Sequence, residues 1–352
     1  MTTYINVVSG KGGTGKTLLC AILAELLGNQ NVSVLVVDMD IFVRGLTTLL
    51  YFQKSESLKL SNPRELTVSD IFHEPENNSN NSNKNEKYSL ATHKYRSFEI
   101  VPAVSRIDEP FEFEREMISN IDYNHMVFKK IRHLIGEDKY DYVFFDCRAG
   151  YDGLVSTIHR RSDITICVQE DDDISDVTAN NLIRQLEREN RRSTIFKVTN
   201  KARNISSFQE LEQKGNKGID SLGYIPFDID VMNSFGKKSF WEDISRSLYK
   251  SAVAEVWNRL AMKTELKHNL FYKRYSPLFS EKVERRFGII GQPQRMLAVL
   301  GLILGICGLI LPLFGEQIMY ILEKRPEFLI SFVISIVGFT MFIFSFLTKR
   351  KR

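Results

Sequence analysis

The residues from Val7 to Thr17, VVSGKGGTGKT, join an apolar strand end to a loop rich in glycine and lysine. The pattern G-x-x-x-x-G-K-[ST] begins at Gly10 and ends with Lys16 and Thr17. In this pattern backbone N–H groups surround phosphates, the lysine reaches β- and γ-phosphate oxygens, and the hydroxyl holds Mg²⁺. From average residue usage, a chain of this length matches it by chance about one time in a hundred. The loop therefore predicts a phosphate site.

The flanking residues supply the elements that such a loop needs. Tyr4–Val8 is typical of a short buried strand, and Leu18–Leu27 is typical of a mostly apolar helix that ends at Gly28. Strand, loop and helix in this order are the context of the motif. A glycine turn that binds nothing is the alternative, but a turn has no need of a lysine followed by a hydroxyl.

Carboxylates follow two further apolar strands. Asp38 and Asp40 come at the end of the β-branched run 32–37, and Asp146 ends the run 142–145. Ligands of open parallel sheets bind at the carboxyl edge of the strands, and an aspartate after such a strand reaches Mg²⁺ directly or through water. The alternative for Asp38 and Asp40 is that they only cap the next turn.

Strands and helices alternate along the chain, which predicts an α/β fold with a mostly parallel sheet and helices on both faces. The P-loop strand should lie in the interior of this sheet. Further predicted elements are strands at 98–103, 162–168, 195–201 and 222–227, and helices at 66–72, 174–192 and 244–260. The polar run 77–83 cannot bury a core, so about 74–90 should be a disordered insertion, and the acidic stretch 108–116 a solvated helix face.

The form KGGTGKT, with Lys11 at its start, resembles the deviant Walker A box of the ParA/MinD family of P-loop ATPases, and the resemblance covers roughly residues 3–262. It implies the cofactors ATP and Mg²⁺ and an ATP-bound homodimer in which Lys11 crosses to the nucleotide of the partner protomer. The phosphate-binding residues implied are Gly10, Lys11, Gly12, Gly13, Thr14, Gly15, Lys16, Thr17 and Leu18.

The same resemblance assigns roles outside the loop. Lys11, Lys16 and Asp40 would be catalytic, with Asp40 orienting the attacking water, and Thr17, Asp38 and Asp146 would surround Mg²⁺.

Two weaker matches complete the predicted nucleotide site. Asn200 stands where the family hydrogen-bonds adenine, and Pro226 where a proline region packs beside the base. One residue departs from the family: Arg148 replaces the proline of DxPAG in the stretch DCRAG, which affects the usual rigidity of the second switch segment.

Composition limits the classes of function. A net charge of +4 is too small to argue for nucleic acid, and the four cysteines lack metal-ligand or CxxC spacing, which is typical of reduced packing residues. The N-terminus does not have the pattern of a signal peptide, so we expect the P-loop in the cytosol.

Two apolar runs, 296–314 and 328–347, each match the thickness of a bilayer core. They predict a transmembrane hairpin at 296–347, after an ATPase domain at 1–262 and a basic juxtamembrane linker at 263–295. Lysine and arginine flank both outer ends, including the tail 348–352, so both termini should face the cytoplasm of a bacterial inner membrane. A buried soluble hairpin is the alternative.

Together these features predict a multi-pass membrane ATPase that acts as an ATP-dependent dimerisation switch, with a protein partner from the same operon and no nucleic acid. Two alternatives stay open. A bacterial tyrosine kinase shares this P-loop lineage but usually has its spans before the catalytic domain and a tyrosine cluster at the C-terminus, whereas this chain ends in KRKR. A nucleotide-binding membrane scaffold with little hydrolysis would need the same phosphate contacts.

Overall fold

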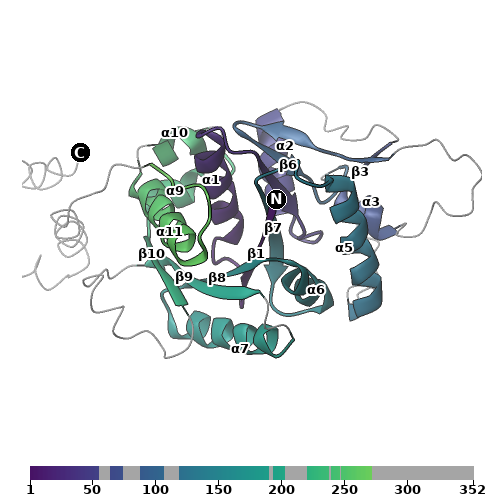
Figure 1. Cartoon of the computed structure of the whole chain (residues 1–352). Helices are drawn as coiled ribbons and strands as arrows, with labels where there is room; N and C mark the ends of the chain where they lie inside the picture. Colours follow the sequence, from purple (N-terminus) through teal and green to yellow (C-terminus); the bar gives the residue numbers. More distant parts are fainter. Residues whose placement is uncertain are drawn as a thin grey trace, which may run out of the picture. The chain divides into compact units, whose positions relative to one another are not determined.

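An eight-stranded sheet with the strand order β10-β9-β8-β1-β7-β2-β6-β5 forms the centre of the computed structural model (Figure 1). The structure describes residues 1–54, 64–73, 88–106, 119–189, 193–202, 220–237, 239–245 and 247–271. The strands of the sheet are β1 (Thr3–Ser9), β2 (Val34–Asp38), β5 (His93–Tyr95), β6 (Phe98–Val101), β7 (Tyr142–Ala149), β8 (Ile164–Glu170), β9 (Thr194–Ala202) and β10 (Asp220–Pro226). Neighbouring strands are parallel except for β5 and β6. The predicted α/β class and the interior place of β1 are confirmed.

Helices cover both faces of this sheet (Figure 1). One face carries α1 (Lys16–Gly28), α2 (Gly45–Lys54), α9 (Ile229–Ser234), α10 (Phe240–Ser245) and α11 (Leu248–Thr264). The other face carries α3 (Val68–His73), α5 (Ile121–Ile135), α6 (Gly153–Arg161) and α7 (Asp173–Glu189).

Alternation along the strands produces two separate hydrophobic layers. In β1, Ile5 and Val7 face the layer of α1 and α11, whereas Tyr4 and Val8 face the layer of α5 and α6. Successive side chains of a strand point to opposite faces, so buried apolar residues at both odd and even positions mean that both faces of β1 are covered. This burial fixes β1, and with it the loop that follows.

The long helix predicted at 244–260 is two helices in the structure. Helix α10 ends at Ser245, and α11 begins at Leu248 after the N-cap Ser247, whose hydroxyl accepts a 2.8 Å hydrogen bond from the N–H of Tyr249. The serine satisfies an N–H group that has no partner within the helix. The apolar pattern continues across this break, which is why the sequence did not reveal it.

The predicted insertion at 74–90 is ordered at its C-terminal end. Strand β4 (Ser89–Leu90) pairs in parallel with β3 (Glu65–Leu66), and Leu90 is buried. Residues 74–87 and the acidic stretch 108–116 lie outside the described residues.

The folded domain extends beyond the predicted boundary at 262. Helix α11 continues to Thr264, and the chain after it packs back on the helix: Asn258 bonds both the N–H and the carbonyl of Leu270, and Trp257 Nε1 donates to the carbonyl of His268. The predicted spans at 296–347 lie outside the described residues. Among the helices that are described, none combines the length and apolarity needed to cross a bilayer.

Candidate nucleotide-binding site

The P-loop joins the carboxyl end of β1 to the first turn of α1. The first intrahelical bond runs from the N–H of Leu19 to the carbonyl of Gly15, so the N–H groups of Lys16, Thr17 and Leu18 have no acceptor within the helix. No other described residue accepts a bond from them. The side chain of Leu18 is buried in the core, so only its backbone N–H can meet a ligand. This end of α1 suits an anion.

Two glycines allow the loop to take its path. Gly15 has φ +91°, and a Cβ there would lie 2.3 Å from Nδ2 of Asn200. A Cβ on Gly10 would lie 2.4 Å from the backbone carbon of Thr178 in α7. No side chain fits at either position. A Cβ on Gly12 or Gly13 would meet no atom within 4 Å, so the loop borders open space at these two residues.

Lys16 is held near the phosphate position by a short chain of hydrogen bonds. Its Nζ donates to Ser9 Oγ over 2.9 Å, and that hydroxyl donates to the carbonyl of Lys11 over 2.7 Å. The lysine is only 8 % exposed, and among the described residues no carboxylate pairs with it. A buried ammonium without a counter-ion favours an anionic ligand.

Asn200, near the carboxyl end of β9, supports the P-loop through a hydrogen bond to its backbone. Its Nδ2 donates to the carbonyl of Thr14 over 2.7 Å, its Oδ1 accepts from the hydroxyl of Tyr249 over 2.9 Å, and the side chain is fully buried. The neighbouring Lys201 donates to the carbonyl of Gly13. Each end of the Asn200 amide makes a hydrogen bond within the protein, so this residue supports the loop, and its contact with adenine stays a prediction.

Pro226 occupies the carboxyl end of edge strand β10, where it pairs with Ala202 of β9 and is half-buried. It shares this edge of the sheet with the P-loop, but no contact joins the two. The contacts of Asn200 and Pro226 with adenine stay predictions.

Two aspartates on adjacent strands form the acidic part of the site. Asp38 and Asp146 are register partners in β2 and β7, and both are buried. Thr17 Oγ1 donates to Asp146 Oδ2 over 2.7 Å, while Asp146 Oδ1 is buried without a hydrogen-bond partner. Burial raises the pKa of both carboxyls, and the charge of Asp146 raises that of Asp38 further.

These groups fit Mg²⁺. The ion is usually held by one or two carboxylates together with substrate phosphates, and a divalent charge would offset the cost of two buried carboxylates. Asp146 offers the unpartnered oxygen, with the Thr17 hydroxyl beside it. Within the described residues no cluster of three or more His, Cys, Asp or Glu forms a metal cage, so phosphate oxygens would have to complete the coordination.

Asp38, which is predicted to lie near Mg²⁺, is bonded by groups of its own chain. Its Oδ2 accepts from both the N–H and the hydroxyl of Thr47 at 2.8 Å, and its Oδ1 accepts from the N–H of Asp40. Asp38 therefore fixes the start of α2 and the loop that joins β2 to this helix.

Asp40 lies half-buried in the loop before α2. Its Oδ1 accepts a 3.0 Å bond from the N–H of Val43, so the residue caps its own turn, which was the alternative to a catalytic role. Its other oxygen has no partner within the described part of the chain. The structure thus leaves one carboxylate oxygen that can accept from water.

Lys11 is paired within its own chain. Its Nζ lies 2.9 Å from Oε2 of Glu170, the last residue of β8, and 2.8 Å from Oδ2 of Asp172, which precedes α7. These two carboxylates raise the pKa of Lys11. A lysine that reaches a second protomer would have to leave this acidic pair.

Arg148, which departs from the family proline, connects the loop after β2 with the start of α6. Its guanidinium lies 4.5 Å from the centre of the Phe42 ring and its Nε 3.3 Å from Asp152 Oδ2. Asp152 in turn caps α6 by accepting from the N–H of Val155. A cation–π contact and an ion pair take the place of the rigidity that a proline would give.

Several residues of the site were not recognised in the sequence. They are Ser9, Thr47, Glu170, Asp172, Lys201 and Tyr249. Ser9 stands directly before the motif and Lys201 directly after Asn200, so adjacency was an available signal for these two. Tyr249 comes from α11, and only the folded chain brings it beneath the loop.

Comparison with known proteins agrees with this geometry. A family model described as an AAA domain matches residues 2–207, more than half of the chain. The chain belongs to this AAA domain family. No curated protein sequence matches it.

Solved structures share the fold of this AAA domain. A plasmid partition protein of Borrelia burgdorferi bound to AMPPNP has a TM-score of 0.55 at 18% identity, over 75% of this chain and 100% of its own. MinD of Pyrococcus horikoshii with Mg-ADP has a TM-score of 0.54 at 19% identity, over 76% and 99%. The MinC:MinD complex of Aquifex aeolicus gives 0.50 at 19%, over 78% and 100%. The fold is that of the ParA and MinD ATPases.

Proposed function

We propose that this chain is a membrane-anchored ATPase that binds ATP and Mg²⁺ at the P-loop and forms a homodimer in the ATP-bound state. A protein partner encoded in the same operon reads that state. The observation that carries the proposal is the unpartnered buried oxygen of Asp146, beside the Lys16 ammonium and the free N–H groups of α1. Two neighbours in fold carry AMPPNP and Mg-ADP, which supports the same ligands here.

The residues would divide the work of phosphoryl transfer by position. The N–H groups of Lys16, Thr17 and Leu18 bind phosphate oxygens, and the Lys16 ammonium turns from Ser9 to the β- and γ-phosphates. Thr17 and Asp146 would hold Mg²⁺, which neutralises developing charge. Asp40 orients the attacking water with its free oxygen. Positioning and charge stabilisation account for most catalysis in this reaction class.

Dimerisation would release Lys11 from Glu170 and Asp172 and bring it to the nucleotide of the other protomer. The lysine is partly exposed at the surface of the loop, so its release needs no change in the core. In this scheme the acidic pair holds Lys11 back in the monomer. The MinD of Aquifex aeolicus was solved with MinC, and the relation of MinD to a partner protein supports a partner here.

Anchoring would come from the hairpin at 296–347. Its two apolar runs are long enough for two spans, and two spans hold a protein in the membrane far more firmly than a reversible amphipathic helix. The basic segment before them would lie against the anionic inner leaflet. The full chain should resist alkaline carbonate extraction, and a chain that ends after Arg274 should be released. Release of the full chain would contradict anchoring.

The Mg²⁺ dependence of ATP binding and hydrolysis tests the nucleotide proposal. We expect Asp146→Asn in the full chain to bind ATP with little dependence on Mg²⁺ and to lose turnover, because the amide cannot supply the ionised oxygen. Asp141→Asn, near the opposite end of β7, is the matched control and should keep wild-type dependence. Equal Mg²⁺ dependence in both variants would contradict the site.

A further inference from the structure

A second polar pocket lies at the amino ends of the strands, on the side of the sheet that carries α5. Its volume is about 790 Å³, and it is lined by Tyr4, His125, Phe128, Lys129, Arg132, His133, Gly136, Glu137 and Arg161. We call it the amino-end pocket. Tyr4 and Ser9 are five residues apart on β1, about 16 Å at the usual rise of a strand. The pocket is therefore distinct from the P-loop site.

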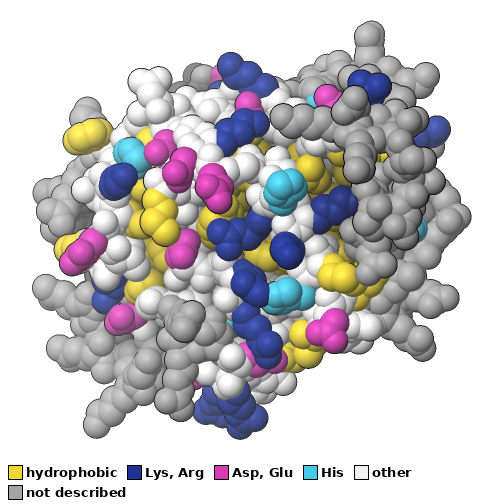
Figure 2. All heavy atoms as spheres, turned by 45° about the vertical axis from the view of Figure 1, so that its right-hand side comes forward, with side chains coloured by type: hydrophobic (Ala, Val, Ile, Leu, Met, Phe, Trp, Pro, Cys, Tyr) yellow, Lys and Arg dark blue, Asp and Glu magenta, His cyan; other side chains and the backbone are white. Residues whose placement is uncertain are grey.

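Cations dominate the lining. Lys129, Arg132 and Arg161 are joined by two histidines, while Glu137 is the single lining carboxylate. Within the described residues no carboxylate pairs with any of the three permanent cations. Figure 2 shows Lys and Arg side chains gathered in a band across this face, with histidines next to them. An excess of one sign in a concave site concentrates the opposite charge.

The carboxylates close by are already engaged. Asp163 accepts from the N–H of Tyr4, and Asp138 pairs with the N-terminal ammonium and accepts from the N–H of Thr2. These two aspartates hold the start of β1 in place, so they do not pair with the cations that line the pocket.

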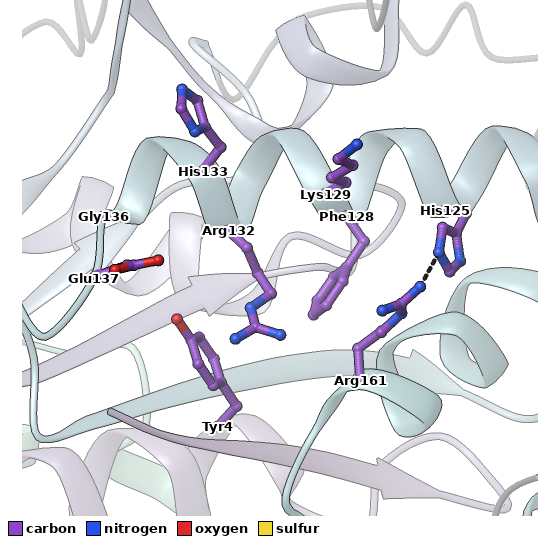
Figure 3. A pocket seen from close by; sticks show the side chains of 9 residues that line it. All are labelled: Tyr4, His125, Phe128, Lys129, Arg132, His133, Gly136, Glu137 and Arg161. Atoms are coloured by element: carbon purple, nitrogen blue, oxygen red, sulfur yellow. Dashed lines mark hydrogen bonds between the residues drawn. The ribbon is translucent and has the colours of Figure 1, made fainter. Parts of the chain in front are cut away.

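Two side chains of α5 lie on the side of the helix that faces Tyr4. Figure 3 shows Arg132 and Phe128 directed from α5 toward Tyr4, and the guanidinium of Arg132 lies 4.1 Å from the centre of the Tyr4 ring. Tyr4 and Phe128 are buried, so the ring face fixes the guanidinium while its N–H groups stay available.

Arg161 and His125 form a hydrogen-bonded pair at the other end of the pocket. The guanidinium of Arg161 donates to Nε2 of His125, which requires a neutral imidazole at that nitrogen. Burial and the nearby charges of Arg161, Arg160 and Lys129 lower the pKa of His125, whereas Asp122 raises it. Burial is the largest of these effects, and the three neighbouring cations act in the same direction.

We propose that the amino-end pocket binds a small molecule through a multiply charged phosphate group, either free or as a lipid headgroup. The planar forks of Arg132 and Arg161 match pairs of phosphate oxygens, with Lys129 and His133 at the rim. Three cations against one carboxylate suit a ligand with at least two negative charges. The volume is that of a small-molecule site, whereas a macromolecule would need a more extended surface.

Calorimetric titration of the full-length Lys16→Ala protein with inorganic pyrophosphate tests this site, because that background weakens phosphate binding at the P-loop. We expect saturable binding that Arg132→Gln weakens about tenfold or more, as for the loss of a charge-assisted hydrogen bond. Arg184→Gln, an exposed arginine of α7 outside the pocket, is the matched control and should leave the affinity unchanged. Lys129→Gln provides a second pocket variant.

A parallel titration with dihexanoyl phosphatidate separates the two sources of the phosphate. Tighter binding of phosphatidate that is lost in Arg132→Gln would assign a lipid headgroup, and tighter binding of pyrophosphate with the same loss would assign a free ligand. The proposal is overturned if neither probe binds saturably, or if both pocket variants bind as the control does. Because the P-loop lysine is absent throughout, these outcomes are independent of ATP hydrolysis.

Discussion

Strand β1 has opposite electrostatic surroundings at its two ends. At the carboxyl end, Lys11 is paired with two carboxylates and Lys16 is bonded to Ser9. At the amino end, Arg132 lies over the Tyr4 ring and Arg161 bonds His125, with no carboxylate partner within the described chain. The difference indicates that the carboxyl end is organised in advance to hold a charged ligand, whereas we expect the cations of the amino end to contribute little to folding.

The largest expected effect is at the carboxyl end. Lys16→Ala should abolish ATP binding, because the lysine is the only loop cation that its own protomer directs to the phosphates. Equilibrium dialysis with labelled ATP measures this. Retention of wild-type affinity would remove the P-loop from the proposed site.

Lys11→Ala should separate binding from turnover. The loop still holds ATP, so the affinity should fall only modestly, while a cation supplied by the other protomer can be worth about 10³-fold in rate. Light scattering on Lys11→Ala combined with Asp40→Ala should show an ATP-bound monomer.

The opposite change is expected when the acidic partners of Lys11 are removed. Glu170→Gln with Asp172→Asn should release Lys11 and favour the dimer. A stable ATP-dependent dimer without Lys11 would contradict its assignment.

Asp40→Ala should keep ATP bound and lower turnover by about a hundredfold or more, the usual range for a group that acts on the attacking water. Asp40→Asn is the matched variant, since its amide oxygen can still accept from the N–H of Val43. Turnover should fall in both. If only Asp40→Ala is impaired, the residue acts through the turn and not through water.

The buried aspartates make the metal-free protein sensitive to pH. Because the folded carboxyls bind protons more tightly than unfolded ones, the free energy of unfolding should fall as the pH rises from about 4, where unfolded aspartate ionises, to about 8, the pKa of folded Asp38. Asp146→Asn should flatten this slope and raise stability at pH 8 by about 2 kcal/mol. Thermal unfolding without Mg²⁺ measures it, and an unchanged slope would contradict the raised pKa of Asp146.

The smallest effect should be at the amino end. Arg132→Gln should change the free energy of unfolding by less than about 1 kcal/mol, because an exposed cation–π contact contributes no more than this. Urea denaturation against wild type measures it. A loss of several kcal/mol would mean that the amino-end arginines are structural, and the contrast between the two ends would fail.

Features encoded by long sequence patterns were predicted, and features that depend on a few residues were not. The P-loop, the strands before Asp38 and Asp146, and their parallel order were all predicted, because continuous apolar runs bounded by polar residues reveal buried strands. The break at Ser247 and the short strand at Ser89–Leu90 were missed. Each depends on one or two hydrogen bonds that leave the hydrophobic pattern unchanged.

The sequence by itself determined the phosphate loop, since backbone N–H groups and a lysine act through spacing within eleven residues. Only the tertiary structure decided which polar groups face inward. It placed the Asn200 amide beneath the P-loop, where it bonds the carbonyl of Thr14 and the Tyr249 hydroxyl of α11. It also assembled the amino-end pocket, because Tyr4, Arg132 and Arg161 come from three separate elements. The spacing of neighbouring residues does not predict such long-range contacts, because packing of the whole sheet brings these residues together.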